Sequence, residues 1–311
     1  MFSVTILGNN SAVPAYERFP TSQLVSLNGN QFLIDCGEGT QMQLMRYKIR
    51  YSRISHIFIS HLHGDHYFGL IGLINSFGLL DRQQDLHVYG PSALKDIIEL
   101  QLKVASTRLP FQLQIHAIES PGILVETEEI KVSCFPTDHR IECYGFLFQE
   151  KTLPRKLASQ QIRPRSYAYC ADTRYDERIL QHIGEVDLLY HESTYLHDQH
   201  EKAELRFHAT AKQAAEFAKK AGANRLLLGH FSSQYETIQV YQTNSIPSEI
   251  PNCDVYVFTS PSNLSSFLTN NEIPKKAKVS LICLSFLPSK TLSKDFLMVR
   301  RKRRVKNCYR R

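Results

Sequence analysis

Five short apolar segments of the sequence are each followed directly by a histidine or an acidic residue. The segments are HIFIS (56–60), IKVSCFPT (130–137), SYAYCA (166–171), VDLLY (186–190) and RLLLG (225–229). Apolar runs of this length predict buried strands. A residue at the end of a strand can turn its side chain out of the core while its backbone stays fixed. The pattern therefore predicts a site that is built from the ends of several strands.

Further strands are predicted where short apolar runs stand between turn residues, at 3–8, 23–27, 31–35, 86–90, 111–118, 144–149 and 253–258. Helices are predicted at 37–47, 67–80, 91–103 and 211–222. Thr210 and Gln213 have a capping-box spacing at the start of the last helix. Helix 67–80 has apolar residues on nearly all faces, which predicts that it is buried. Strands with interspersed helices indicate an α/β protein with sheet layers inside and helices outside.

The residues at the strand ends have the chemistry of metal ligands. The candidates are His61, His63, Asp65, His66, His139, Asp172 and His230. Imidazole and carboxylate suit zinc, and seven ligands are too many for one tetrahedral ion but fit two ions that share a carboxylate. Without a cation, burying several unpaired ionisable groups would cost on the order of several kcal/mol each. The isolated histidines are interpreted as structural or exposed; these are His56, His87, His116 and His182.

The positive charge of the chain is concentrated at its end. The net charge is +7, but the last twelve residues hold eight Lys or Arg and no acid, which leaves 29 basic against 30 acidic residues elsewhere. We interpret this tail as a solvated end or a loose contact for a polyanion. The seven cysteines are scattered without a CxxC pair and are predicted to be reduced thiols of a cytosolic protein. No secretion signal or membrane span is predicted.

The motif HLHGDH (61–66) resembles the metal motif of the metallo-β-lactamase superfamily. The fuller set resembles the ribonuclease Z family of tRNA 3′-processing endonucleases, in the stretches ILGNNSAVP, FLIDCGEGTQMQL, IFISHLHGDHYFGLIGL, PTDH, YCADT, HEST, HAT and LLLGH. These cover roughly residues 1–240. The resemblance implies an αββα sandwich of two packed mixed sheets with helices on the outer faces. It implies a catalytic domain at 1–258 and leaves 259–311 as an atypical extension.

The resemblance also implies a role for each site residue. His61, His63 and His139 would hold one zinc, and Asp65, His66 and His230 the other, with Asp172 as the bridge. Asp65 would also orient the attacking water and accept its proton. Glu192 and His208 would assist the leaving group, and Asp35 would hold the loop below the metals. The implied reaction leaves a 3′-hydroxyl on the tRNA and a 5′-phosphate on the trailer. Two Zn²⁺ per subunit are implied, with Mn²⁺ or Fe²⁺ as alternatives, in a cytoplasmic homodimer that acts on precursor tRNA.

The sequence departs from the family pattern in the parts that would recognise RNA. The long-armed members carry a flexible arm before the strand of the bridging aspartate, whereas only 23 residues separate Phe148 from Asp172 here, so a shortened arm is expected at about 149–167. The family motif P-x-K-x-R-N is replaced by PAYERF (14–19), which keeps Arg18 as the predicted substrate-binding residue. The chemistry is therefore predicted to be intact while recognition differs.

Two other functions fit the same residues. One is a phosphodiesterase or sulfatase-like hydrolase of the same superfamily, which the short arm favours. The other is a nucleic-acid-binding protein that retains metals without useful turnover. The complete ligand set argues against the second, and the HEST and HAT stretches favour the endonuclease over the first.

Deletion of residues 300–311 is expected to weaken the binding of precursor tRNA. Each lost phosphate contact removes counterion release, so the dependence of log Kd on log salt should become flatter. Filter binding at several salt concentrations measures both effects. Unchanged affinity and slope would show that the tail does not contact the RNA.

Overall fold

The computed structural model describes residues 2–151, 164–238, 240–241, 254–257 and 283–285. Within them lie two seven-stranded sheets. The strands of the first, in spatial order, are β14 (Cys283–Ser285), β1 (Phe2–Gly8), β2 (Ser22–Leu27), β3 (Asn30–Ile34), β4 (Ile54–Phe58), β5 (Leu86–Gly90) and β6 (Leu113–Ala117). Those of the second are β13 (Asp254–Val257), β12 (Arg225–Gly229), β11 (Leu188–Glu192), β10 (Ser166–Cys170), β9 (Tyr144–Glu150), β8 (Ile130–Pro136) and β7 (Gly122–Glu126).

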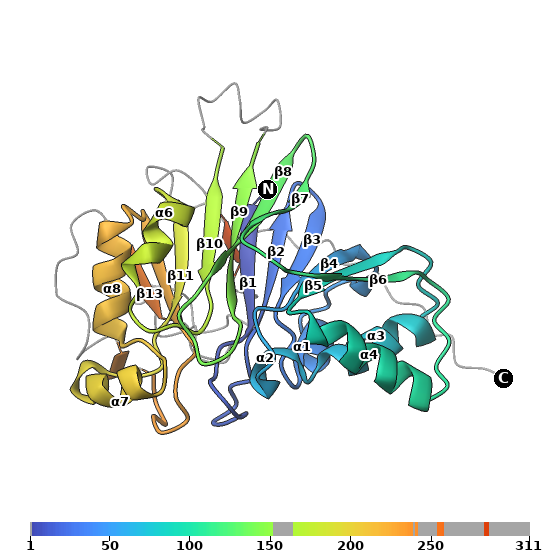
Figure 1. Cartoon of the computed structure of the whole chain (residues 1–311), viewed down its shortest axis with the longest axis horizontal. Helices are drawn as coiled ribbons and strands as arrows, with labels where there is room; N and C mark the ends of the chain where they lie inside the picture. Colours follow the sequence, from blue (N-terminus) through green and yellow to red (C-terminus); the bar gives the residue numbers. More distant parts are fainter. Residues whose placement is uncertain (1, 152–163, 239, 242–253, 258–282, 286–311) are drawn as a thin grey trace, which may run out of the picture.

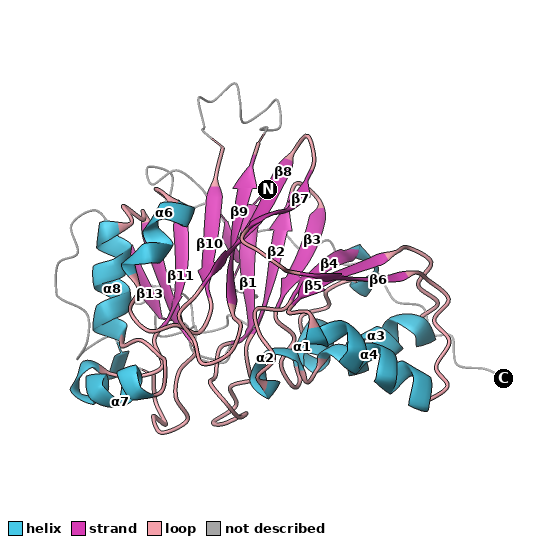
Figure 2. Cartoon of the chain, viewed as in Figure 1, coloured by secondary structure: helices cyan, strands magenta, loops and turns pink. Residues whose placement is uncertain are grey.

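Helices cover the outer faces of both sheets (Figures 1 and 2). Beside the first sheet lie α1 (Thr40–Arg46), α2 (Gly64–Tyr67), α3 (Leu70–Leu79) and α4 (Ala93–Val104). Near the second lie α6 (Leu180–Ile183), α7 (His200–Leu205) and α8 (Ala211–Lys220). Single 3₁₀ turns occur at Tyr51–Arg53, Glu177–Ile179 and His197–Gln199. This arrangement confirms the predicted αββα sandwich with mixed sheets.

The alternation of side chains along each strand explains the layers. In β4, Phe58 packs between the sheets against Phe146 and Phe148, whereas Ile57 belongs to the separate core under α1, α3 and α4. A strand with a core on each side must be apolar on both faces, as the run HIFIS is. The sandwich is therefore held by apolar contacts on every layer boundary, and polar side chains collect where the strands end.

The capping box of α8 is confirmed. The Thr210 side chain accepts from the Gln213 backbone amide, and the Gln213 side chain accepts from the Thr210 amide. Such a cap satisfies amide groups that have no partner within the first helical turn. Because His208 lies two residues before this start, the cap fixes the chain on which His208 stands.

The strand ends converge as predicted. In the first sheet β3 to β6 run parallel, and in the second β10 to β13 run parallel. The carboxyl ends of parallel strands meet at one edge of a sheet, where ligand sites of such sheets usually form. The segments after β4, β10, β11 and β12 therefore reach one region, at the lower edge of the sandwich in Figure 1.

Several sequence-based expectations need correction. The strand β7 was not predicted. Helix 67–80 is divided into α2 and α3 around Gly69, and its end is not buried, since Leu79 and Leu80 are 87% and 63% exposed. The division at 258 stays a prediction; within the predicted extension, β14 pairs with β1.

Other expectations lie partly outside the described residues. The ends of the predicted arm at Gln149 and Ser166 are paired strand residues, while 152–163 and the basic tail lie outside the described part of the chain. The cysteines whose side chains are described are buried free thiols; these are Cys36, Cys134, Cys143 and Cys170. None of the helices described here has the length and apolar character needed to cross a membrane.

Candidate metal centre

The first group of ligands combines the loop after β4 with the loop after β8. His61 Nε2 lies 3.0 Å from His63 Nδ1, and His139 Nε2 lies 3.1 Å from the same His63 atom. The carboxylate of Asp172 is 3.6 Å from His61 and 3.9 Å from His139. These four side chains converge on one point. Burial lowers the pKa of all three imidazoles, that of His63 to about 4, so they are neutral at pH 7 and able to bind a cation.

The second group lies beside the first and combines α2 with the loop after β12. His66 Nε2 and His230 Nε2 are 3.3 Å apart, and the Asp65 carboxylate is 3.6 Å from the former and 3.3 Å from the latter. His230 has a φ of 58°, a left-handed backbone conformation that is uncommon outside glycine. Strain of this kind persists where surrounding contacts enforce it, commonly at functional sites.

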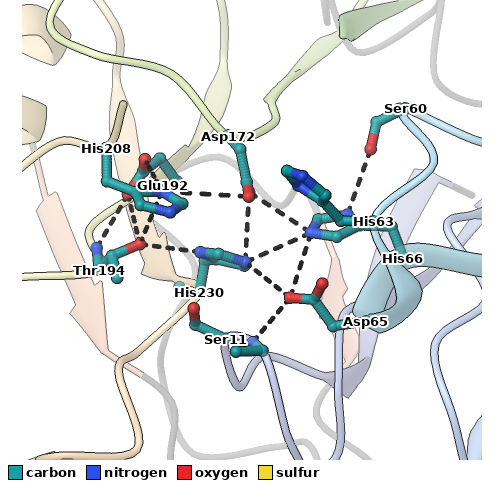
Figure 3. Close-up of polar contacts among 12 residues, drawn as sticks. Ser11, Ser60, His63, Asp65, His66, Asp172, Glu192, Thr194, His208 and His230 are labelled. Atoms are coloured by element: carbon teal, nitrogen blue, oxygen red, sulfur yellow. Dashed lines mark hydrogen bonds and ion pairs between the residues drawn. The ribbon is translucent and has the colours of Figure 1, made fainter. Parts of the chain in front are cut away.

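Asp172, just after β10, lies between the two groups. Figure 3 shows it beside His66 and His230 of the second group. Its Oδ2 atom faces the first group, whereas its Oδ1 atom lies 3.4 Å from His66 and 3.2 Å from His230. Oδ1 is buried and has no hydrogen-bond partner among the described residues. One carboxylate thus presents an oxygen to each of two adjacent ligand sets, which is the arrangement of a bridging ligand.

Neighbouring groups determine which ring nitrogens are available. His139 Nδ1 lies 3.0 Å from the Phe207 carbonyl, and His66 Nδ1 lies 2.8 Å from the Asp35 carboxylate. Both oxygens can only accept, so each Nδ1 carries a proton, and Nε2 is the atom that would bind a cation, once any proton on it has been displaced.

The same holds for His230, whose Nδ1 contacts the Thr194 hydroxyl at 2.8 Å while that hydroxyl donates to Glu192. When both rings are neutral, the Nε2 lone pairs of His66 and His230 face one another at 3.3 Å and cannot bond to each other. A shared cation resolves that repulsion. The residues present therefore fit two divalent cations.

Asp35 supports the centre from below, as expected. Its carboxylate accepts from the Ser60 backbone amide at 2.7 Å, from the Tyr169 hydroxyl at 2.6 Å and from His66 at 2.8 Å. All these groups are buried. Burial lowers the pKa of His66, but the carboxylates of Asp172, Asp65 and Asp35 outweigh it and raise that pKa in the metal-free chain. A cation at this group therefore replaces a proton.

Glu192 and His208 form a second pair at the rim of the centre. Glu192 is fully buried and accepts from His208 Nδ1 at 2.8 Å, and also from the Thr173, Thr194 and Ala209 amides. His208 lies 4.0 Å from the Asp172 carboxylate. Burial lowers the pKa of His208, but the Glu192 charge and hydrogen bond outweigh it and raise the pKa to about 9.

Two residues beside the predicted ligands point elsewhere. His191 alternates with Glu192 on β11 and therefore faces the opposite side, where its ring packs against Phe217 of α8. Asp138 precedes His139, but its carboxylate pairs with Arg174 at 2.9 Å. The contrast follows from strand and loop geometry, because neighbouring side chains on an extended chain point in opposite directions.

Arg18 has structural contacts. The residue is 5% exposed, and its guanidinium donates to Asn10 Oδ1 and to the Tyr235 and Glu236 carbonyls. The prediction that it binds substrate stays a prediction. Sequence reasoning missed Thr194, whose hydroxyl links Glu192 to His230, and the Ala12 amide, which donates to Asp65 at 2.7 Å. A backbone donor has no sequence signal, and a lone threonine is too common to stand out.

Comparison with known proteins agrees with this geometry. A ribonuclease Z of Porphyromonas gingivalis is 40% identical, over 76% of this chain and 91% of the relative. One from Bacteroides thetaiotaomicron is 39% identical, over 76% and 87%. The crystal structure of the short form of human tRNase Z superposes with a TM-score of 0.67 at 33% identity, over 75% of this chain and 93% of that one. Residues 2–246 match the family model described as Anti-Pycsar protein Apyc1.

A metallo-β-lactamase fold protein of Bacillus subtilis shares the fold, with a TM-score of 0.65 at 21% identity over 83% of this chain and 97% of that one. The sandwich and the paired ligand sets at its strand ends thus define a metal-dependent hydrolase of the metallo-β-lactamase fold. Within that class, the chain belongs to the ribonuclease Z family.

We expect about two zinc ions per chain after the protein is stripped, reloaded with Zn²⁺ and desalted. His139→Ala and His230→Ala should each lose about one ion, and Asp172→Ala more than one, because its two oxygens face both groups. Elemental analysis against protein concentration measures the ratio. Asp138→Asn is the matched control and should keep both ions. Two full sites in both histidine variants would refute the assignment.

Proposed function

We propose that this chain is an endoribonuclease that removes the 3′ trailer of precursor tRNA by hydrolysing one phosphodiester. The observation that carries the proposal is the bridged pair of ligand groups with the Glu192–His208 pair beside it, in a chain 40% identical to ribonuclease Z. The products are a tRNA 3′-hydroxyl and a trailer 5′-phosphate. We assign two Zn²⁺ per subunit, with Mn²⁺ or Fe²⁺ as alternatives.

Two bound divalent cations would supply Lewis acidity for the phosphoryl oxygens and lower the pKa of a water molecule. The chain has to orient that water and take up its proton. Asp65 is placed for both tasks, since the Ala12 amide donates to its Oδ2 atom at 2.7 Å and His230 Nε2 lies 3.3 Å from the same atom. Burial raises the pKa of Asp65, but His66 and His230 outweigh it and hold the pKa well below its usual range, so the group is ionised and can accept a hydrogen bond.

The leaving 3′ oxygen needs a proton, and we assign its delivery to His208. The ring can keep a proton at pH 7 because Glu192 raises its pKa to about 9. Four of the donors to Glu192 are fixed groups of the backbone or of Thr194, so the carboxylate cannot turn away from His208. Nδ1 is held by Glu192, and Nε2 remains to donate.

His208→Ala should lower kcat on precursor tRNA by about 10²- to 10⁴-fold, the usual contribution of a general acid. A small aryl phosphodiester releases a stable phenolate, so its hydrolysis should fall much less. Steady-state kinetics on both substrates, with zinc measured in the same samples, tests the role.

His197→Ala is the control, because this neighbouring histidine is exposed. It should change neither rate. Equal losses on both substrates at unchanged zinc content would contradict the role as leaving-group acid.

A second candidate function keeps the catalyst and changes the substrate to another phosphodiester or a sulfate ester. The reason to test this candidate is that residues 2–246 match a family model described as Anti-Pycsar protein Apyc1 and not as ribonuclease Z. Selective turnover of a small diester, with precursor tRNA uncleaved, would support this candidate. A wild type that binds tRNA without turnover would instead support a binding protein, provided that Asp65→Ala binds tRNA equally well.

We propose further that the chain forms a homodimer through α1 and the end of α3. Large apolar side chains are exposed there, namely Met42, Met45, Leu79 and Leu80. Met45 and Leu80 line one hollow of about 630 Å³ together with Ile49 and Phe77. Exposed apolar patches of this kind mark interaction surfaces. We also propose a cytoplasmic location, which the precursor tRNA substrate and the free buried thiols support.

Light scattering on the wild type should give twice the chain mass of 35.8 kDa. Met45→Glu and Leu80→Glu should shift the protein toward monomer, because a buried carboxylate opposes association. Leu205→Glu is the control, since Leu205 is exposed on α7, far from α1 and α3 in Figure 1. A monomeric wild type, or a dimer unaffected by both variants, would refute this interface.

A further inference from the structure

The loop between β1 and β2, residues 9–21, lies along the metal centre. The Ser11 amide donates to the Phe231 carbonyl and the Phe231 amide donates to the Asn9 carbonyl, both at 2.9 Å. Phe231 directly follows the ligand His230. The Ala12 amide donates to Asp65 at 2.7 Å. The first half of the loop is therefore attached to the ligand Asp65 and to Phe231, the neighbour of the ligand His230.

The tip of this loop is held in a strained and exposed conformation. Ala12, Tyr16 and Glu17 have φ values of 63°, 51° and 60°, in the left-handed region that non-glycine residues rarely adopt. Tyr16 is 52% exposed and Val13 49% exposed. A large aromatic ring in an uncommon backbone conformation, on a rigid support beside a catalytic centre, indicates a binding function.

Arg18 supplies the rigidity. Its Nε, Nη1 and Nη2 atoms donate at 2.7 to 2.9 Å to Asn10, Glu236 and Tyr235, so the buried guanidinium has no freedom to move. The guanidinium carbon lies 5.2 Å from the centre of the Tyr16 ring. Such a contact is an attraction between a cation and an aromatic face. One side of the ring is therefore supported, and the exposed half of the side chain is available to a ligand.

The tip is chemically suited to a base rather than to a phosphate. Within residues 9–21 the charged side chains are Glu17 and Arg18. Arg18 is buried in contacts of its own, and Glu17 repels phosphate. An exposed aromatic ring instead offers a face for stacking, which is how proteins bind unpaired bases of RNA. Four residues from Ala12 to Tyr16 span at most about 14 Å, so such a base belongs to a nucleotide near the reacting phosphate.

We propose that Tyr16 is the stacking platform for one unpaired base that flanks the scissile phosphate, and that Arg18 is the positioning residue that holds its ring. This assignment rests on the proposed function and names a substrate contact of the same site. In this assignment Arg18 does not bind the substrate itself but holds the Tyr16 ring that does.

The test compares Tyr16→Ala and Tyr16→Phe with the wild type on precursor tRNA. Loss of stacking should raise KM by about 5- to 100-fold for Tyr16→Ala, with kcat and zinc content little changed. Tyr16→Phe keeps the ring and should stay within about two-fold of wild type. Precursors with a single abasic nucleotide, placed in turn at the two positions on each side of the cleaved bond, identify the partner base.

At the partner position, removal of the base should raise the wild-type KM to the Tyr16→Ala value and leave the Tyr16→Ala variant unaffected. An unchanged KM for Tyr16→Ala overturns the inference. So does a raised KM for Tyr16→Ala that differs from the wild-type KM on every abasic precursor. A wild type that does not cleave precursor tRNA overturns the proposed function, and this inference with it. Cleavage with wild-type kinetics in Tyr16→Ala overturns this inference alone.

Discussion

The site depends on the contacts that the Asp172 carboxylate makes with both sets of ligands. The two oxygens of this carboxylate face two different sets of imidazoles, whose ring nitrogens converge on shared points. That arrangement is unfavourable in a buried pocket unless cations occupy the spaces between the donors. The chain therefore builds a centre that is complete only with metal, where loops that follow strands of both sheets meet.

Two buried carboxylates, each with several donors, keep this centre in shape. Asp35 orients His66 from below, and Glu192 holds His208 from the side. Each accepts from at least one backbone amide, so its position follows from the main chain. They act on different partners and to different ends, since one directs a lone pair toward a ligand position and the other keeps a proton on a ring at the rim.

The apolar runs made most strands predictable, and the histidines and aspartates that follow them made the candidate ligands predictable. A run such as HIFIS can only be a strand with a core on both sides, and the histidines that follow it had to leave that core. Helix 67–80 shows the limit of the same reasoning. Its apolar composition predicted burial, but Leu79 and Leu80 lie at the surface, because composition does not say which face a neighbour covers. Strand β7 was missed because its side chains are largely exposed at a sheet edge and carry no clear period.

The residue pattern by itself determined an α/β protein with sheets inside and helices outside, the seven candidate ligands and the capped start of α8, because strand runs, donor types and capping residues are local properties of the chain. The αββα sandwich came from the resemblance to a known family. Only the tertiary structure decided that Asp172 faces both groups, that His191 turns away while Glu192 turns in, and that Arg18 supports Tyr16. Apart from the Arg18–Tyr16 contact, these join residues from 16 to more than 100 positions apart. Their geometry depends on how the two sheets and their loops pack, which no local pattern records.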